Sequence, residues 1–94
     1  MFYKKSDYQL MGYEKAKNTK KKYDGILKRK SDKKIIRVPF GAVGYGNYSD
    51  NSGLNLYKGT GNKTKRDAYL ARHKNDIKEG YYSPGFFSIR IFWS

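Results

Sequence analysis

The sequence YDGILKRKSDKKIIRVPF, residues 23–40, decides the fold. Two apolar runs flank a polar link, with Ile26 and Leu27 before it and Ile35, Ile36 and Val38 after it. The link contains Ser31 and Asp32, which favour turns because their side chains bond to nearby backbone. Residues 23–40 therefore predict a β-hairpin. Pro39 either ends the second strand or marks it as an edge strand.

The segment after the hairpin, residues 41–62, is rich in glycine and tyrosine and has no net charge. Such a run of small residues predicts a loop with several positive-φ positions. The lack of net charge distinguishes this loop from a disordered basic tail, and the interleaved tyrosines indicate that it folds over something.

Residues 63–79 predict a helix. Tyr69, Leu70, His73 and Ile77 share one face at helical spacing. The helix begins either at an Asn62 N-cap or at a capping box that starts at Thr64. It ends at Gly80.

The last segment, residues 81–94, fits either a helix or a strand. Ser83-Pro84 is typical of an N-cap followed by proline in the first turn, whereas the alternation of Ile89 and Ile91 suits a strand. We favour the helix. The predicted fold class is then a small single α+β domain, and its apolar C-terminal segment belongs to the core or to an interface.

The first 22 residues contain seven lysines and little apolar surface. A segment of this composition does not offset its chain entropy by burial. We therefore predict a basic N-terminal arm over residues 1–22, with a short helical turn around Leu10, Met11 and Tyr13, followed by a domain over residues 23–94. Deletion of the arm is expected to leave that domain folded.

Composition limits the remaining choices. Ninety-four residues form one domain at most, and the chain has no cysteine, which excludes disulfides and thiolate metal sites. The first ten residues are not a signal peptide, and no apolar run is long enough to span a bilayer. The formal charge of +13 exceeds the roughly 2–8 units that solubility needs and favours a polyanionic partner.

The sequence shows no reaction chemistry. His73 is the single histidine, and its place on the apolar helix face indicates a structural role. The eight acidic residues show no paired arrangement of the glycosidase or two-metal kind. Residues 41–46 lack both the P-loop ending and the dinucleotide fingerprint. We expect no catalytic residue, no metal and no cofactor.

Two sets of residues are candidates for binding. The polyanion-binding candidates are the basic residues around the hairpin, Lys20, Lys21, Lys22, Lys28, Arg29, Lys30, Lys33 and Lys34. The partner-binding candidates are aromatic, because tyrosine and tryptophan bury a large area at low entropy cost: Tyr45, Tyr48, Phe86, Phe87 and Trp93.

Three motifs in series resemble a small family of uncharacterised proteins of large nucleocytoplasmic DNA viruses, including those of algae. They are PFGAVGY at 39–45 with NYS at 47–49, KRDAYLARH at 65–73, and YSPGFFS at 82–88, which is followed by Trp93. Residues 1–22 lie outside the resemblance. The resemblance implies a viral protein without known enzymatic activity and supplies no catalytic residues.

Two hypotheses follow, of which we favour the first and keep the second as the alternative. In the first, the chain is a minor capsid or cement protein that binds neighbouring capsid proteins through its basic arm and aromatic residues. In the second, it binds nucleic acid without sequence preference and packages it. The low arginine content favours charge neutralisation over base reading. The expected location is the virion, after passage through the host cytoplasm or nucleus.

Overall fold

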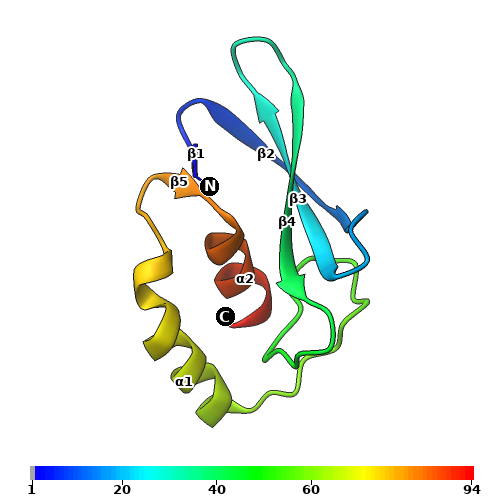
Figure 1. Cartoon of the computed structure of the whole chain (residues 1–94), viewed down its shortest axis with the longest axis vertical. Coiled ribbons are helices and arrows are strands. Elements are labelled where there is room, and N and C mark those ends of the chain that lie inside the picture. Colours follow the sequence, from blue (N-terminus) through cyan, green and yellow to red (C-terminus); the bar gives the residue numbers. More distant parts are fainter. Residues whose placement is uncertain (1) are drawn as a thin grey trace.

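The computed structural model describes residues 2–94, and for residue 76 it describes only the backbone. It has the predicted α+β fold class. In chain order the elements are β1 (Tyr3–Lys4), β2 (Tyr8–Lys15), β3 (Lys21–Arg29), β4 (Ile35–Ala42), α1 (Lys63–His73), the short 3-10 helix η1 (Lys74–Asp76), β5 (Tyr81–Tyr82) and α2 (Pro84–Phe92). Strands β2, β3 and β4 form an antiparallel sheet in that order, and β1 pairs with β5 (Figure 1).

The predicted hairpin is confirmed as β3 and β4. Tyr23 lies opposite Phe40 and Leu27 opposite Ile36. The turn closes where the Arg29 amide donates to the Lys34 carbonyl at 2.8 Å. Pro39 stays within β4, which is an edge strand, so the edge alternative was correct.

Strand β2 corrects the prediction of an arm. Residues 8–15 pair with β3 along their length, and Tyr8, Leu10 and Tyr13 pack against the core. A bulge between Leu10 and Gly12 explains the difference, because one extra residue places both Leu10 and Tyr13 on the core face. Gly12 adopts φ 144° there. The apolar spacing that resembled a helical turn is therefore that of a bulged strand.

Helix α2 confirms the preferred prediction for the C-terminal segment. Ser83 is the N-cap, and its hydroxyl accepts a hydrogen bond from the Phe86 amide at 3.1 Å. Phe87, Ile91 and Phe92 are buried against the sheet, whose core residues are Tyr23, Leu27, Val38 and Phe40. Figure 1 shows α2 between the sheet and α1.

Close contact between α2 and the sheet depends on Gly25. A Cβ at this position would lie 2.8 Å from Cε2 of Phe87. The missing side chain lets the Phe87 ring lie directly on the β3 backbone. Glycine ordinarily destabilises a strand, but here the packing of Phe87 requires it.

Helix α1 is shorter than predicted. Asn62 is the N-cap, with its side-chain oxygen accepting from the Lys65 amide at 3.2 Å, so the capping box at Thr64 is not used. The helix ends at His73 rather than at residue 79, and Ile77 has an extended backbone. None of its residues is fully buried, so packing provides little to extend the helix further.

The loop between β4 and α1 caps the C-terminus of α2. The amides of Tyr48 and Ser49 donate to the Phe92 carbonyl at 2.8 and 2.9 Å, and the Asn51 amide donates to the Ile91 carbonyl at 3.0 Å. These bonds satisfy carbonyls that a helix end leaves without an intrahelical partner. The loop folds over another element, as its tyrosines predicted.

Candidate functional site

The basic candidates divide between the two ends of β3. Lys28, Arg29, Lys30, Lys33 and Lys34 form the hairpin tip, which projects away from both helices (Figure 1). Lys20, Lys21 and Lys22 lie at the opposite end of the strand. At about 3.3 Å per residue the two groups are roughly 25 Å apart. The sequence therefore predicted two basic regions but not their separation.

Lys22 is not available on the protein surface, as the polyanion-binding prediction required. It is only 4% exposed, and its Nζ donates to the Tyr45 carbonyl at 2.6 Å and to Asn47 Oδ1 at 2.9 Å. The ammonium also lies 5.0 Å from the centre of the Phe92 ring. Burial lowers the pKa of Lys22, and the charge of Asp50 partly opposes that shift. This lysine is part of the interior and holds the loop to the sheet.

A cavity of about 510 Å³ lies beside Lys22, between the end of β4, the following loop, α1 and α2. We call it the α1–α2 cavity. Its cationic lining residues are Lys21, Lys22 and Arg72, and none of the lining residues that the structure describes carries a carboxylate. The cavity is therefore electropositive, which favours an anionic ligand.

One wall of the α1–α2 cavity is a stack of three rings. Tyr69 lies between His73 and Trp93, at ring-centre distances of 4.2 and 4.3 Å, and the Tyr69 and Trp93 planes differ by only 9°. Helical spacing places Tyr69 and His73 together on α1, and Trp93 joins them from the end of α2. His73 therefore stacks on Tyr69 and also lines the cavity.

The five aromatic candidates for partner binding do not form one surface. Phe87 is fully buried in the core and cannot contact a partner, which corrects its assignment. The Tyr48 ring lies under the Arg66 guanidinium at 5.2 Å, and the Phe86 ring lies under Lys5 Nζ at 4.3 Å. Trp93 belongs to the cavity wall. Tyr45 is 76% exposed and remains available.

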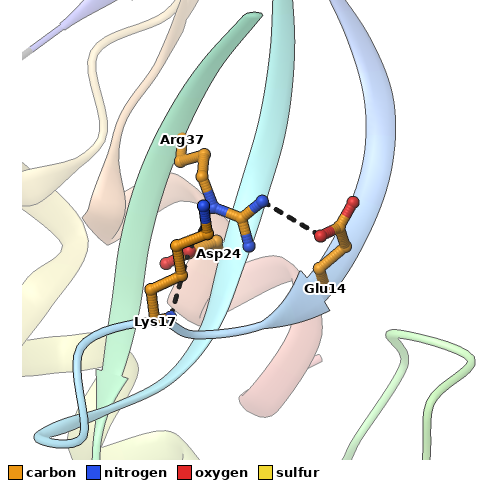
Figure 2. Close-up of polar contacts among 4 residues, drawn as sticks. All are labelled: Glu14, Lys17, Asp24 and Arg37. Atoms are coloured by element: carbon orange, nitrogen blue, oxygen red, sulfur yellow. Dashed lines mark hydrogen bonds and ion pairs between the residues drawn. The ribbon is translucent and has the colours of Figure 1, made fainter.

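Two carboxylates share one arginine on the face of the sheet opposite α2. Arg37 Nε donates to Asp24 Oδ2 at 2.8 Å, and its NH1 donates to Glu14 Oε1 at 3.0 Å (Figure 2). Asp24 is almost fully buried, so this pairing offsets the cost of its desolvation. The group joins β2, β3 and β4 and has no geometry for acid–base catalysis.

Asp50 also has a structural role, because its hydrogen bonds hold the loop after β4 in place. Its carboxylate accepts from the Tyr23 hydroxyl at 2.6 Å, from the Ser52 amide and hydroxyl, and from the Tyr57 amide. Burial alone would raise the pKa of Asp50, but these hydrogen bonds together outweigh burial and lower the pKa. Burial and the bond to Asp50 raise the pKa of Tyr23.

In the part of the chain whose side chains the structure describes, no group of three or more His, Cys, Asp or Glu residues is placed to hold a metal ion. In the same part of the chain no helix combines the length and apolar character that a membrane span requires.

The sequence did not reveal the α1–α2 cavity. Of the cavity's cationic residues, only Lys21 and Lys22 were among the binding candidates. The sequence placed Arg72, and the aromatic Tyr69, on a helix without assigning them to a site. The i, i+4 pair Tyr69–His73 was visible, but the stacking of Trp93 on it depends on how α1 and α2 pack.

Comparison with protein-family models, curated proteins and solved structures finds no match to this chain. The resemblance to proteins of large DNA viruses stays a hypothesis on the sequence motifs alone. The function must therefore be argued from the fold, the surface charge and the cavity.

Proposed function

We propose that this protein is a non-enzymatic domain that binds nucleic acid without sequence preference. The observation that carries the proposal is the use of its charges. All four ion pairs among the described residues are made by arginine, namely Arg29, Arg37 and Arg66. None of the sixteen lysines forms an ion pair with a carboxylate that the structure describes. The lysine charge can therefore act on a ligand.

Most of the acidic side chains already have partners within the fold. Glu14, Asp24, Asp32 and Asp67 are in ion pairs, and Asp50 accepts four hydrogen bonds. Few carboxylates remain to compete with phosphate for the lysines. Lysine acts as a point charge, so contacts of this kind neutralise phosphates without reading bases.

Salt dependence tests the proposal directly. The affinity of the purified protein for a mixed-sequence duplex of about 20 base pairs is measured at about 50 and 200 mM salt. If the hairpin tip neutralises four or five phosphates, affinity should fall by roughly 10²- to 10³-fold between the two conditions. A duplex affinity that changes by less than about threefold would refute the proposal.

A matched pair of variants locates the phosphate-binding lysines. Replacing Lys30, Lys33 and Lys34 by Gln should weaken binding and reduce the salt slope by roughly two to three units, because each neutralised phosphate adds about 0.9 to that slope. All three side chains are exposed and none is in an ion pair among the described residues. The control removes the same charge from α1 and its flank through Lys58, Lys63 and Lys65, which are equally exposed.

A second candidate is the structural role in a virus particle that the sequence resemblance suggested. The loop before α1 exposes several apolar side chains, Val43, Tyr45, Leu54 and Leu56, which suits contact with another protein. An acidic protein of charge density similar to DNA, added as competitor, separates the two candidates. If it displaces the duplex completely, the charge is generic and a capsid-protein partner is favoured. If the duplex stays bound, nucleic acid is the ligand.

A further inference from the structure

The α1–α2 cavity differs from the hairpin tip in having an aromatic wall. Lysines at the tip offer charge alone, whereas the cavity combines Lys21, Lys22 and Arg72 with the stacked rings of Tyr69, His73 and Trp93. Its volume of about 510 Å³ lies within the roughly 300–1,000 Å³ range of sites that enclose small organic ligands. A ligand that suits both features has a flat ring and a negative charge.

Lys22 makes the charge requirement specific. The residue is 4% exposed, and the two atoms that accept hydrogen bonds from its ammonium are uncharged oxygens of Tyr45 and Asn47. An ammonium forms up to three hydrogen bonds, and the third has no acceptor among the described residues, although the ammonium also lies 5.0 and 5.4 Å from the centres of the Phe92 and Tyr57 rings. Because Lys21 and Arg72 line the same cavity without a carboxylate, a cationic ligand would be repelled. A phosphate oxygen would supply the missing negative partner.

The ring stack makes the second requirement specific. Tyr69 lies between His73 and Trp93, so its own faces are covered, and the faces left for a planar ligand are the outer ones of His73 and Trp93. All three rings of the stack are partly exposed. Stacking on aromatic side chains strengthens the binding of an unpaired base by roughly 5- to 150-fold. A base inside a duplex cannot enter, because its faces are covered by its neighbours.

We infer that the α1–α2 cavity holds one unpaired nucleotide of a single-stranded nucleic acid, with its base on the outer face of Trp93 and its phosphate near Lys21, Lys22 and Arg72. This inference rests on the proposed function and assigns it a site. The domain then binds any nucleic acid through its lysines and prefers strands that offer an unpaired base.

The test uses three probes of equal length, about 12 nucleotides each. They are oligothymidine, a deoxyribose-phosphate strand without bases, and a duplex. Trp93 is the only tryptophan, so its fluorescence reports on the cavity itself. Oligothymidine should quench Trp93 and bind at least about fivefold more tightly than the strand without bases, since only the first offers a stacking partner. The duplex should bind with little quenching.

Two variants that remove the same number of charges show which region causes the preference for bases. Lys21→Gln with Arg72→Gln changes the cavity, and Lys30→Gln with Lys33→Gln changes the hairpin tip by the same two charges. The tip variant should weaken all three probes and keep the preference for bases. The cavity variant should lose that preference and the quenching. Thermal unfolding of both variants should match the parent, because none of the four residues forms an ion pair among the described residues.

The outcomes separate the inference from the proposed function. Equal binding of oligothymidine and the strand without bases, with a normal salt slope, would overturn the nucleotide site and leave nucleic-acid binding intact. Absence of salt-dependent binding to every probe would overturn both. Thymidine monophosphate serves as a fourth probe. If it binds as tightly as the strand, the cavity takes a free nucleotide, and the assignment to a strand is wrong.

Discussion

Replacement of Gly25 by alanine tests the packing of α2 on the sheet. In a strand interior this substitution would ordinarily stabilise by about 0.5–1 kcal/mol, because glycine loses more backbone freedom on folding. Here the new Cβ would lie 2.8, 2.9 and 3.0 Å from three atoms of the Phe87 ring. Overpacking of this kind costs about 1–3 kcal/mol. The outcome depends on whether the ring can move.

The surroundings of Phe87 indicate that it cannot. Its ring contacts the rings of Tyr13, Phe40 and Tyr82 at centre distances of 5.8, 5.4 and 5.7 Å. Any shift away from β3 therefore disturbs other aromatic residues that pack against the core. We expect a net loss of about 2 kcal/mol, which corresponds to a fall in Tm of roughly 8–16 °C for a domain of this size.

Urea unfolding measures the change, with the m-value as a check that the transition stays two-state. Gly46→Ala is the control, because a Cβ there meets open space, and it should change stability by less than about 0.5 kcal/mol. In a Phe87→Leu background the cost of Gly25→Ala should fall by about 1–2 kcal/mol, since the clashing ring atoms are gone. Equal or greater stability of the Gly25→Ala protein would refute the contact on which this packing argument rests.

Three further predictions follow from the loop and the N-terminal strands. Asp50→Asn should cost about 2–3 kcal/mol at neutral pH, because it weakens hydrogen bonds to a charged acceptor. Since the folded pKa of Asp50 is lowered, its stabilisation is complete above about pH 3.8 and is lost as pH falls through the folded value. The difference between the two proteins should therefore shrink in acid, as urea midpoints at several pH values would show. Gly59→Ala places a Cβ against the Tyr48 carbonyl and should destabilise by about 1–3 kcal/mol in the same assay, and an unchanged midpoint would contradict this contact. Removal of residues 1–15 deletes β1 and β2 and should abolish cooperative thermal unfolding, contrary to the behaviour expected of a free arm.

The elements predicted correctly are those with local signals. The β3–β4 hairpin has its turn residues between two apolar runs, and α2 begins at Ser83-Pro84, where the cap and the fixed proline φ act within one turn. These patterns depend only on neighbours in sequence. The end of α1 was less predictable, because the apolar stripe continued to Ile77 although little packing holds the helix beyond His73.

Strand β2 could not be predicted because its pattern is broken by the bulge. Without pairing to β3, the spacing of Leu10 and Tyr13 fits no strand, and the surrounding lysines resemble a disordered tail. Its stability comes from partners distant in sequence, namely the β3 backbone and the aromatic core. Lys22 shows the same limit, because nothing separates it from Lys20 and Lys21 in sequence, yet tertiary contacts bury it alone.

The different uses of arginine and lysine link the fold to the proposed function. The guanidinium of Arg37 bridges Asp24 and Glu14 across the sheet, which a point charge would do less well. The surface lysines form no such bridge with the carboxylates that the structure describes, so they can be replaced with little effect on stability. Lys22 is the exception, because its ammonium both ties the loop to the interior and lines the α1–α2 cavity. Binding at the hairpin tip should therefore be separable from folding by mutation, whereas at Lys22 the two are coupled. An anion in the cavity should stabilise the loop through the same side chain.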